Sequence, residues 1–347
     1  MHRRDLMILL AGATAGVRAA PALQFPADFG AHPQSRTEWW YVTGNLQADS
    51  RLWGFQVTFF RSSTGLQADA SSRFAATELV FAHAALTDLA ERRLHHDQRI
   101  ARSGFGIAQA GAGDTDVGLR DWGLKRSEGS YRARVVSDSA GFTLDLQITP
   151  TQPLLLQGEA GLSRKGPSPE HTSRYYSEPQ LTVRGTLRLR NAPLTVTGTA
   201  WLDHEWSDAF LPPQAVGWDW IGMNLDDGSA LTAFRLRRAD GTSLYAGGSF
   251  RRNGDAVRTF ASDGVTFTPG RVWQSALSKA RYPVQWRVAT PAGTFTVVAL
   301  LDDQELDSRS STGAIYWEGL SELLDKSGQR IGRGYLEMTG YAATLRL

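Results

Sequence analysis

The segment 201–207, WLDHEWS, combines two carboxylic acids, a histidine and two tryptophans within seven residues. Successive side chains of an extended strand point to opposite faces. One face therefore carries Trp201, Asp203 and Glu205, and the other carries Leu202, His204 and Trp206. An ordinary half-buried strand has one plain polar face, so both faces of this strand are predicted to contact something.

These residue types suit acid–base chemistry on an apolar molecule. Protonation of an apolar molecule needs a strong acid and walls that tolerate the resulting cation. A carboxyl group kept protonated by burial supplies the acid, and tryptophan rings stabilise a cation by about 0.5–2 kcal/mol each. The resulting hypothesis makes Asp203 the general acid, His204 the base or orienting group, and Trp206 a cation-facing wall.

A structural interpretation of the same residues stays open. A buried Asp-His pair in a strand is often a hydrogen-bonded node that joins two domains. In that case, mutation of Asp203 or His204 lowers stability without altering ligand affinity.

Further acids lie beside aromatic residues. Glu38 shares a face with Trp40, so it either pairs with an arginine such as Arg61 or points into a ligand cavity. Asp219, between two tryptophans, poses the same question. The predicted ligand-binding set is Glu38, Trp40, Tyr176, Trp201, Glu205, Trp218, Asp219 and Trp220. The aromatic members serve either as core or as ligand wall.

Other motifs carry little chemistry. His95-His96-Asp97 is interpreted as a solvated turn, because it has no spaced partners of the kind that a metal site needs. The acidic segment 302–305 is also interpreted as a solvated turn, with calcium binding as the alternative. The chain has no phosphate-cradling loop, dinucleotide fingerprint or nucleophile elbow. We therefore expect no metal and no cofactor.

The elements that must position these residues are short strands bounded by turns. The alternation of Trp53, Phe55, Val57 and Phe59 is typical of a strand with one buried face. Strands are predicted at 37–46, 52–61, 78–87, 131–136, 142–149, 181–189, 195–205, 217–225, 230–238, 244–250, 284–290, 294–301, 315–319 and 334–347. The glycine-rich segment 108–118 is predicted to be a surface loop.

The two halves of the chain look alike, which indicates a weak internal duplication with a boundary near residue 192. The predicted domains are 25–192 and 193–347. About eight strands in roughly 150 residues is what a closed antiparallel barrel requires. We predict an all-β fold of two linked barrels, with a pair of sandwiches as the alternative.

The N-terminus indicates export. Arg3-Arg4 is followed by an apolar run and small residues, so residues 1–22 are interpreted as a twin-arginine-type signal peptide cleaved after Ala19 or Ala22. A short uncleaved anchor is the alternative. The expected product is periplasmic or otherwise exported and soluble. Lys+Arg is 37 against Asp+Glu 35, with no basic run, so nucleic acid is not an expected partner.

Five segments in order carry a family resemblance: TEWWYVTG at 37–44, GFQVTFFR at 54–61, YYS at 175–177, AWLDHEWS at 200–207 and YLEMTGY at 335–341. They resemble the family that contains AttH-like proteins and carotenoid 1,2-hydratase (hydroxyneurosporene synthase). The resemblance covers nearly all of the chain after the leader. It implies two lipocalin-like barrels of the calycin type.

The resemblance also implies one of two activities. Carotenoid hydratases of this family are lyases that add water to a terminal C=C bond of an acyclic carotene without a cofactor. AttH-like members are exported proteins often associated with ABC permeases. In the hydratase pattern Asp203, His204 and Trp206 match, whereas Glu205 and Ser207 depart from it.

The leading interpretation is an exported tandem-barrel protein that binds a long apolar molecule, an isoprenoid or lipid, as a carrier or envelope factor, with possible peripheral membrane contact. A cofactor-free hydro-lyase is second. A protein-binding partner of an ABC permease is third. Cavity geometry discriminates them: an enclosed tunnel ending at His204 favours chemistry, an open calyx favours transport, and a filled core favours the partner role.

Overall fold

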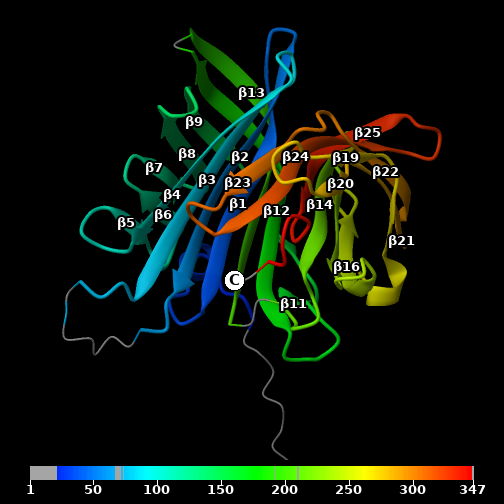
Figure 1. Cartoon of the computed structure of the whole chain (residues 1–347), viewed down its shortest axis with the longest axis horizontal. Coiled ribbons are helices and arrows are strands. Elements are labelled where there is room, and N and C mark those ends of the chain that lie inside the picture. Colours follow the sequence, from blue (N-terminus) through cyan, green and yellow to red (C-terminus); the bar gives the residue numbers. More distant parts are fainter. Residues whose placement is uncertain (1–21, 67–71, 73, 191, 209–210, 346–347) are drawn as a thin grey trace, which may run out of the picture.

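The computed structural model describes residues 22–66, 72, 74–190, 192–208 and 211–345 (Figure 1). The predicted signal peptide lies outside these residues except for Ala22. Helical structure in the described part consists of two short 3₁₀ turns, η1 (Ala27–Phe29) and η2 (Ser262–Gly264). No helix among the described residues has the length and apolar character needed to span a membrane.

The first sheet contains thirteen antiparallel strands: β1 (Thr37–Ala48), β2 (Arg51–Ser63), β3 (Glu78–Asp88), β4 (Arg93–Arg102), β5 (Ala108–Ala110), β6 (Asp116–Leu119), β7 (Trp122–Ser127), β8 (Ser130–Ser137), β9 (Phe142–Thr149), β10 (Leu155–Leu156), β11 (Leu162–Arg164), β12 (Thr172–Leu189) and β13 (Ala192–Ser207). Their order is β4-β3-β2-β1-β13-β12-β9-β8-β7-β6-β5, with β10 and β11 on β12. The sheet curls until β3 and β4 contact β5 and β6 at its other end.

The second sheet contains ten antiparallel strands: β14 (Gly217–Leu225), β15 (Ala230–Arg237), β16 (Ser243–Arg251), β17 (Arg258–Phe260), β18 (Thr266–Pro269), β21 (Gln285–Thr290), β22 (Gly293–Ala299), β23 (Glu305–Ser308), β24 (Ala314–Leu324) and β25 (Arg330–Met338). Their order is β17-β16-β15-β14-β25-β24-β22-β21-β18, with β23 on β24. β19 (Val272–Gln274) and β20 (Arg281–Pro283) form a separate pair. The predicted all-β fold of two packed antiparallel barrels is confirmed.

Alternating side chains fill the interior of each barrel. The predicted buried face of β2 is confirmed, because Trp53, Phe55, Val57 and Phe59 are all buried in the core of the first barrel. In the second barrel, Ile221 and Met223 of β14 belong to a separate core. Each barrel thus has its own hydrophobic core.

A third cluster of buried residues lies between the two barrels. It joins Tyr41 and Trp201 of the first sheet to Trp220, Leu320 and Tyr335 of the second. β1, β2, β12 and β13 contact β14, β24 and β25 across this junction. The strands at the junction are therefore buried on both faces, which explains why β13 carries acidic, histidine and tryptophan side chains rather than one plain polar face.

Gly54 on β2 allows the sheets to approach closely. A Cβ atom at this position would lie 2.7 Å from the Tyr335 hydroxyl and 2.9 Å from Leu320 Cβ. We expect Gly54→Val to lower the free energy of unfolding by about 1–3 kcal/mol through overpacking. Urea unfolding measures the change. Gly118→Ala is the control, because its nearest neighbour would be 3.4 Å away; equal losses in both variants would contradict this account.

The structure corrects four sequence interpretations. Residues 193–207, placed in the second half by the boundary at 192, form β13 of the first sheet, where β13 pairs with β1 and β12. His95-His96-Asp97 lies within strand β4 and not in a turn. The segment 108–118 contains β5 and the start of β6. Gln304 and Glu305 are buried, so 302–305 is not simply a solvated turn.

Candidate ligand cavity between the two barrels

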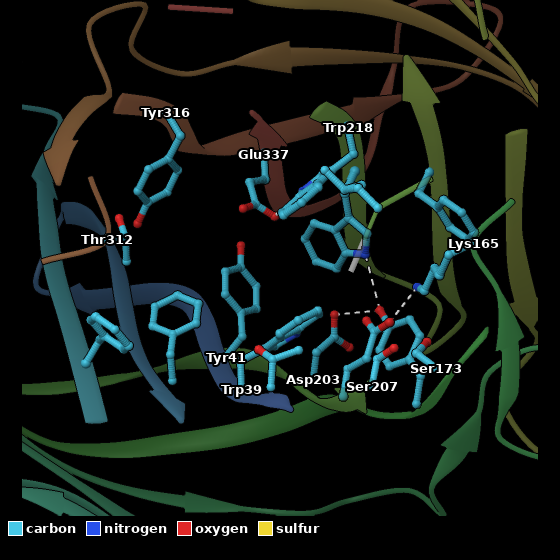
Figure 2. A pocket seen from close by; sticks show the side chains of 18 of the residues that line it. Trp39, Tyr41, Lys165, Ser173, Asp203, Ser207, Trp218, Thr312, Tyr316 and Glu337 are labelled. Atoms are coloured by element: carbon cyan, nitrogen blue, oxygen red, sulfur yellow. Dashed lines mark hydrogen bonds and ion pairs between the residues drawn. The ribbon is translucent and has the colours of Figure 1, made fainter. Parts of the chain in front are cut away.

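A cavity of about 310 Å³ lies where the outward faces of the two sheets meet. Its first wall comes from β1, β2, β3, β12 and β13, and its second wall from β14, β15, β24 and β25 (Figure 2). Aromatic rings line much of it: Trp39, Tyr41, Phe60, Phe81, Tyr175, Trp218, Trp220, Phe234 and Tyr316. The tunnel or calyx that would identify an enzyme or a carrier was expected inside a barrel. That expectation is wrong for the described residues, because each barrel holds a packed core. A binding role therefore depends on this cavity between the barrels.

Asp203 projects from β13 into this cavity. Its carboxylate accepts hydrogen bonds from Tyr175 Oη at 2.7 Å, Ser177 Oγ at 2.5 Å and Trp201 Nε1 at 2.6 Å. Burial raises the pKa of Asp203 to about 7, although these three hydrogen bonds act in the opposite direction. Asp203 is therefore an acid that still holds its proton near neutral pH.

Glu205, two residues further along β13, forms an ion pair with Lys165. Lys165 Nζ lies 2.8 Å from its carboxylate. The same ammonium lies 4.5 Å from the ring centre of Tyr175 and 4.6 Å from that of Phe234. The Lys165 charge is thus held between an acid and two aromatic faces at the cavity wall.

Two more acids lie on the wall formed by the second barrel. Glu318 of β24 and Glu337 of β25 are directly opposite each other in the antiparallel register. Trp218 Nε1 donates a hydrogen bond of 3.1 Å to Glu337. Burial raises the pKa of Glu337 to about 7, and burial together with the neighbouring Glu337 raises the pKa of Glu318 well above its usual range.

A second polar group, here called the histidine cluster, consists of His32, Glu38, Arg61 and His204. One Glu38 oxygen lies 2.7 Å from His32 Nδ1 and 2.8 Å from His204 Nε2, and the other accepts from Arg61 Nε at 2.9 Å. Burial alone would raise the pKa of Glu38, but hydrogen bonds to the two histidines outweigh it and lower that pKa to about 2.

The histidine cluster is closed by its aromatic neighbours. Tyr176 Oη lies 3.0 Å from His204 Nδ1. Trp206 stacks on His32 at 3.6 Å between ring centres, and Trp40 stacks on His204 at 4.6 Å. The ligand atoms of His32, Glu38 and His204 lie within 4.8 Å of one another, but Arg61 occupies the carboxylate as well, so this arrangement fits a hydrogen-bonded node better than a cation site.

The predicted site residues therefore fall into separate groups. Asp203, Glu205, Trp218 and Trp220 line the cavity, and Trp201 bonds to Asp203 beside it. Glu38, Trp40, Tyr176, His204 and Trp206 lie in the first barrel. The structure does not bring Asp203 and His204 together, because they leave opposite faces of β13. A site in which His204 deprotonates a water next to Asp203 does not fit this geometry.

The structure also shows whether Glu38 and Asp219 pair with arginines or point into the cavity. Glu38 pairs with Arg61, as one of the two sequence interpretations predicted. Asp219 pairs with Arg235 at 2.7 Å and Arg237 at 3.1 Å and accepts a hydrogen bond from Tyr341 Oη at 2.8 Å. Asp219 is thus a paired acid and does not line the cavity as its two tryptophan neighbours do.

Sequence reasoning missed several cavity residues. Glu318 lies in a predicted strand, but it could be recognised as one of a pair of acids only once the strand opposite it, which carries Glu337, was known. Lys165 belongs to the stretch between predicted strands, where no periodicity marks it. Tyr41 had one available signal, since it lies within the matched segment 37–44 and alternates with Trp40.

The fold and the cavity define a class of protein: a pair of antiparallel β-barrels with an aromatic-lined cavity between them. More closely, the chain belongs to the AttH-like family, whose pattern matches residues 16–341. No match was found among curated protein sequences.

Two crystal structures are similar to this chain. A suspected AttH from Nitrosomonas europaea is 48% identical, with 93% of this chain and 98% of that chain covered and a TM-score of 0.87. Kievitone hydratase from Nectria haematococca is 17% identical, with 94% of this chain and 95% of that chain covered and a TM-score of 0.72. The second likeness establishes a shared fold.

The raised pKa of Asp203 predicts that the free energy of unfolding depends on pH. Its pKa is about 7 in the folded state and about 3.9 when unfolded, so between these values the folded state binds more protons and loses stability as pH rises. Asp203→Asn removes this loss. From about pH 5 to about pH 8, we expect the stability of the variant relative to wild type to improve by on the order of 2 kcal/mol.

Urea unfolding at the two pH values tests this expectation. Asp145→Asn is the control, because Asp145 is a partly exposed surface acid bonded to Arg132, and its pKa is lowered instead of raised. A difference between Asp203→Asn and wild type that stays constant with pH would show that Asp203 is already ionised in the folded protein.

Proposed function

We propose that this protein binds a small apolar molecule in the cavity between its two barrels. The observation that carries the proposal is the cavity itself, which is lined largely by aromatic rings and buried acids. Ligand pockets commonly measure about 300–1,000 Å³, so 310 Å³ lies at the small end of that range. A long isoprenoid or lipid would place one segment there and extend the rest outside.

The proposal includes an extracytoplasmic setting. Its support is the sequence pattern of residues 1–22, with paired arginines before an apolar run, and the association of AttH-like members with ABC permeases. A carrier that hands an apolar molecule to or from such a permease is consistent with this setting. Native mass spectrometry of protein recovered from the exported fraction, with extraction of any apolar molecule that accompanies it, tests the setting and the cargo together.

A cavity-filling variant tests where binding occurs. Leu211 lines the cavity, so Leu211→Trp is expected to weaken binding of a neutral apolar dye such as Nile red by about tenfold or more, because the indole occupies the ligand's volume. Fluorescence titration gives the Kd. Leu66→Trp is the matched control, since Leu66 is 56% exposed and outside the cavity lining. Equal affinity in both variants would place the dye elsewhere.

A second candidate function is cofactor-free addition of water to a C=C bond. Asp203 favours it, because this carboxyl holds a proton near neutral pH while facing an apolar cavity. The shared fold with a protein described as a hydratase adds support. In this reaction Asp203 gives its proton to one alkene carbon, water adds through oxygen to the other, and the water's surplus proton returns to the Asp203 carboxylate.

A further inference from the structure

The cavity holds more acids than cations. Its lining includes four carboxyl groups, on Asp203, Glu205, Glu318 and Glu337. The lining has two cationic side chains among the described residues, and both are already paired: Lys165 with Glu205, and Arg61 with Glu38 and Glu78. Three carboxyl groups therefore face the cavity with no cation beside them in the part of the chain that the structure describes.

Glu318 is the least satisfied of these acids. It is 2% exposed, and neither of its carboxyl oxygens makes a hydrogen bond of ordinary geometry with a described residue. The Tyr41 hydroxyl lacks such a bond as well, although it lies close enough to lower the pKa of Glu318 slightly. A buried polar group without a hydrogen-bond partner costs about 1–3 kcal/mol of stability. A ligand that pairs with the Glu318 carboxyl group would remove this cost.

Other buried acids in the described residues have partners. Glu38 and Asp219 pair with arginines, and Glu305 accepts from Tyr282 Oη at 2.8 Å. Asp203 accepts three hydrogen bonds. The protein thus satisfies buried acids as a rule, and Glu318 is an exception located on a cavity wall.

Figure 2 shows what surrounds this position. The carboxyl group of Glu337 and the hydroxyl of Tyr41 point toward each other across the cavity, with Tyr316 on one side and Trp218 on the other. Glu318 lies opposite Glu337 in the strand register. Two acids enclosed by aromatic rings form the arrangement that recognises organic cations, because the ring faces and the carboxylates both attract positive charge.

We propose that the cavity accepts an apolar molecule that carries a cationic nitrogen, an amine or quaternary ammonium, and that this nitrogen lies between Glu318, Glu337 and Tyr41. The inference rests on the proposed ligand-binding function and names the class of ligand. The apolar body of the ligand lies against the tryptophan and phenylalanine side chains, and its cation supplies the missing counter-charge.

The protonation of the two acids links binding to proton release. The groups that face Glu318 are Glu337, Tyr41, Tyr316 and Tyr335, and none of them is a cation. Burial and Glu337 keep the pKa of Glu318 high in the empty cavity. An ammonium group favours the carboxylate form, so amine binding at neutral pH releases a proton to solvent.

The test compares three ligands with the same chain: decylamine, 1-decanol and decanoate, each below its aggregation limit. Isothermal titration gives each Kd, and titration in two buffers of different ionisation enthalpy gives the protons released. We expect decylamine to bind about tenfold or more tightly than 1-decanol, decanoate to bind more weakly than either, and amine binding at neutral pH to release close to one proton.

The double replacement Glu318→Gln/Glu337→Gln is expected to bring the decylamine affinity down to that of 1-decanol and to abolish proton release, because either acid alone could still pair with the ammonium. Glu322→Gln is the control, since Glu322 lies on the same strand outside the cavity lining and bonds to Arg333. Equal affinity of wild type for amine and alcohol, or an amine preference that survives the double replacement of Glu318 and Glu337, overturns this inference while the ligand-binding function stands. Failure of all three ligands to bind overturns both.

Discussion

Replacement of Arg61 by leucine is expected to cost about 3–5 kcal/mol of the free energy of unfolding, a large share of what a folded protein possesses. Arg61 is 1% exposed and lies between Glu38 and Glu78. One guanidinium nitrogen also donates to the backbone carbonyls of His32 and Ser35, each at 2.6 Å. The substitution leaves Glu38 ionised and buried without its cation. Urea unfolding near neutral pH measures the loss.

A surface pair provides the comparison for Arg61→Leu. Arg132 bonds to Asp145, but the two side chains are 65% and 38% exposed, so Arg132→Leu is expected to cost less than about 1 kcal/mol. Combining Glu38→Gln with Arg61→Leu is expected to be less damaging than Arg61→Leu alone, because no buried charge is left unpaired. Similar losses for Arg61→Leu and Arg132→Leu would mean that the histidine cluster contributes no more than a surface ion pair.

The histidine cluster shows that the structural role and the cavity-facing role, both considered for Asp203 and His204, belong to different residues. A stabilising node exists, as one interpretation of His204 held, but its acid is Glu38 from β1 and not Asp203. The node therefore stabilises the interior of the first barrel and does not join the two barrels. Asp203 is not part of this node and lines the cavity instead.

Local periodicity predicted much of the fold, because alternation specifies which side chains share a face. The prediction that both faces of 201–207 contact other groups is confirmed: Asp203 and Glu205 line the cavity, while Leu202 and Trp206 belong to the first core. Such a pattern shows that both faces are buried. It does not show what buries each one.

Pairing between distant strands could not be predicted in the same way. β13 pairs with β1 in a register that runs from Thr37↔Ser207 to Gln47↔Thr197, and no local signal in 193–207 distinguishes this distant partner from a strand of the second half. The cross-strand pair of Glu318 and Glu337 has the same origin, since it arises only when β24 and β25 are in register. The cavity acids on the second wall were therefore not recognisable as a pair from their sequence positions.

Strand β4 was missed for a different reason. Its sequence, RLHHDQRIAR, is largely polar, and His96 and Asp97 are only partly buried. Its side chains still have specific partners, since Asp97 accepts from Ser137 Oγ at 2.8 Å and Arg99 donates to the Val136 carbonyl at 2.9 Å. An edge strand that helps to close a barrel through polar contacts lacks the apolar alternation on which prediction depends.

For the second proposed function, the addition of water to a C=C bond, Asp203→Asn is expected to reduce turnover by about 10²–10⁴-fold, because an amide cannot supply the proton that starts the reaction. Hydration has a readout that does not require product to accumulate. Reversible protonation of an acyclic isoprenoid alkene in D₂O places deuterium on carbon, which mass spectrometry detects. Wild-type protein should incorporate deuterium and form alcohol, and Asp203→Asn should lose both activities together.

Two further variants show whether such a loss reflects proton transfer. Asp145→Asn, the same substitution at a partly exposed surface acid, should leave turnover unchanged. His204→Gln should lower stability but leave turnover per folded molecule unchanged, since His204 lies on the other face of β13 and bonds to Glu38 and Tyr176. Full turnover in Asp203→Asn, or loss of turnover in folded His204→Gln, would assign the proton transfer to a group other than the cavity-facing acid.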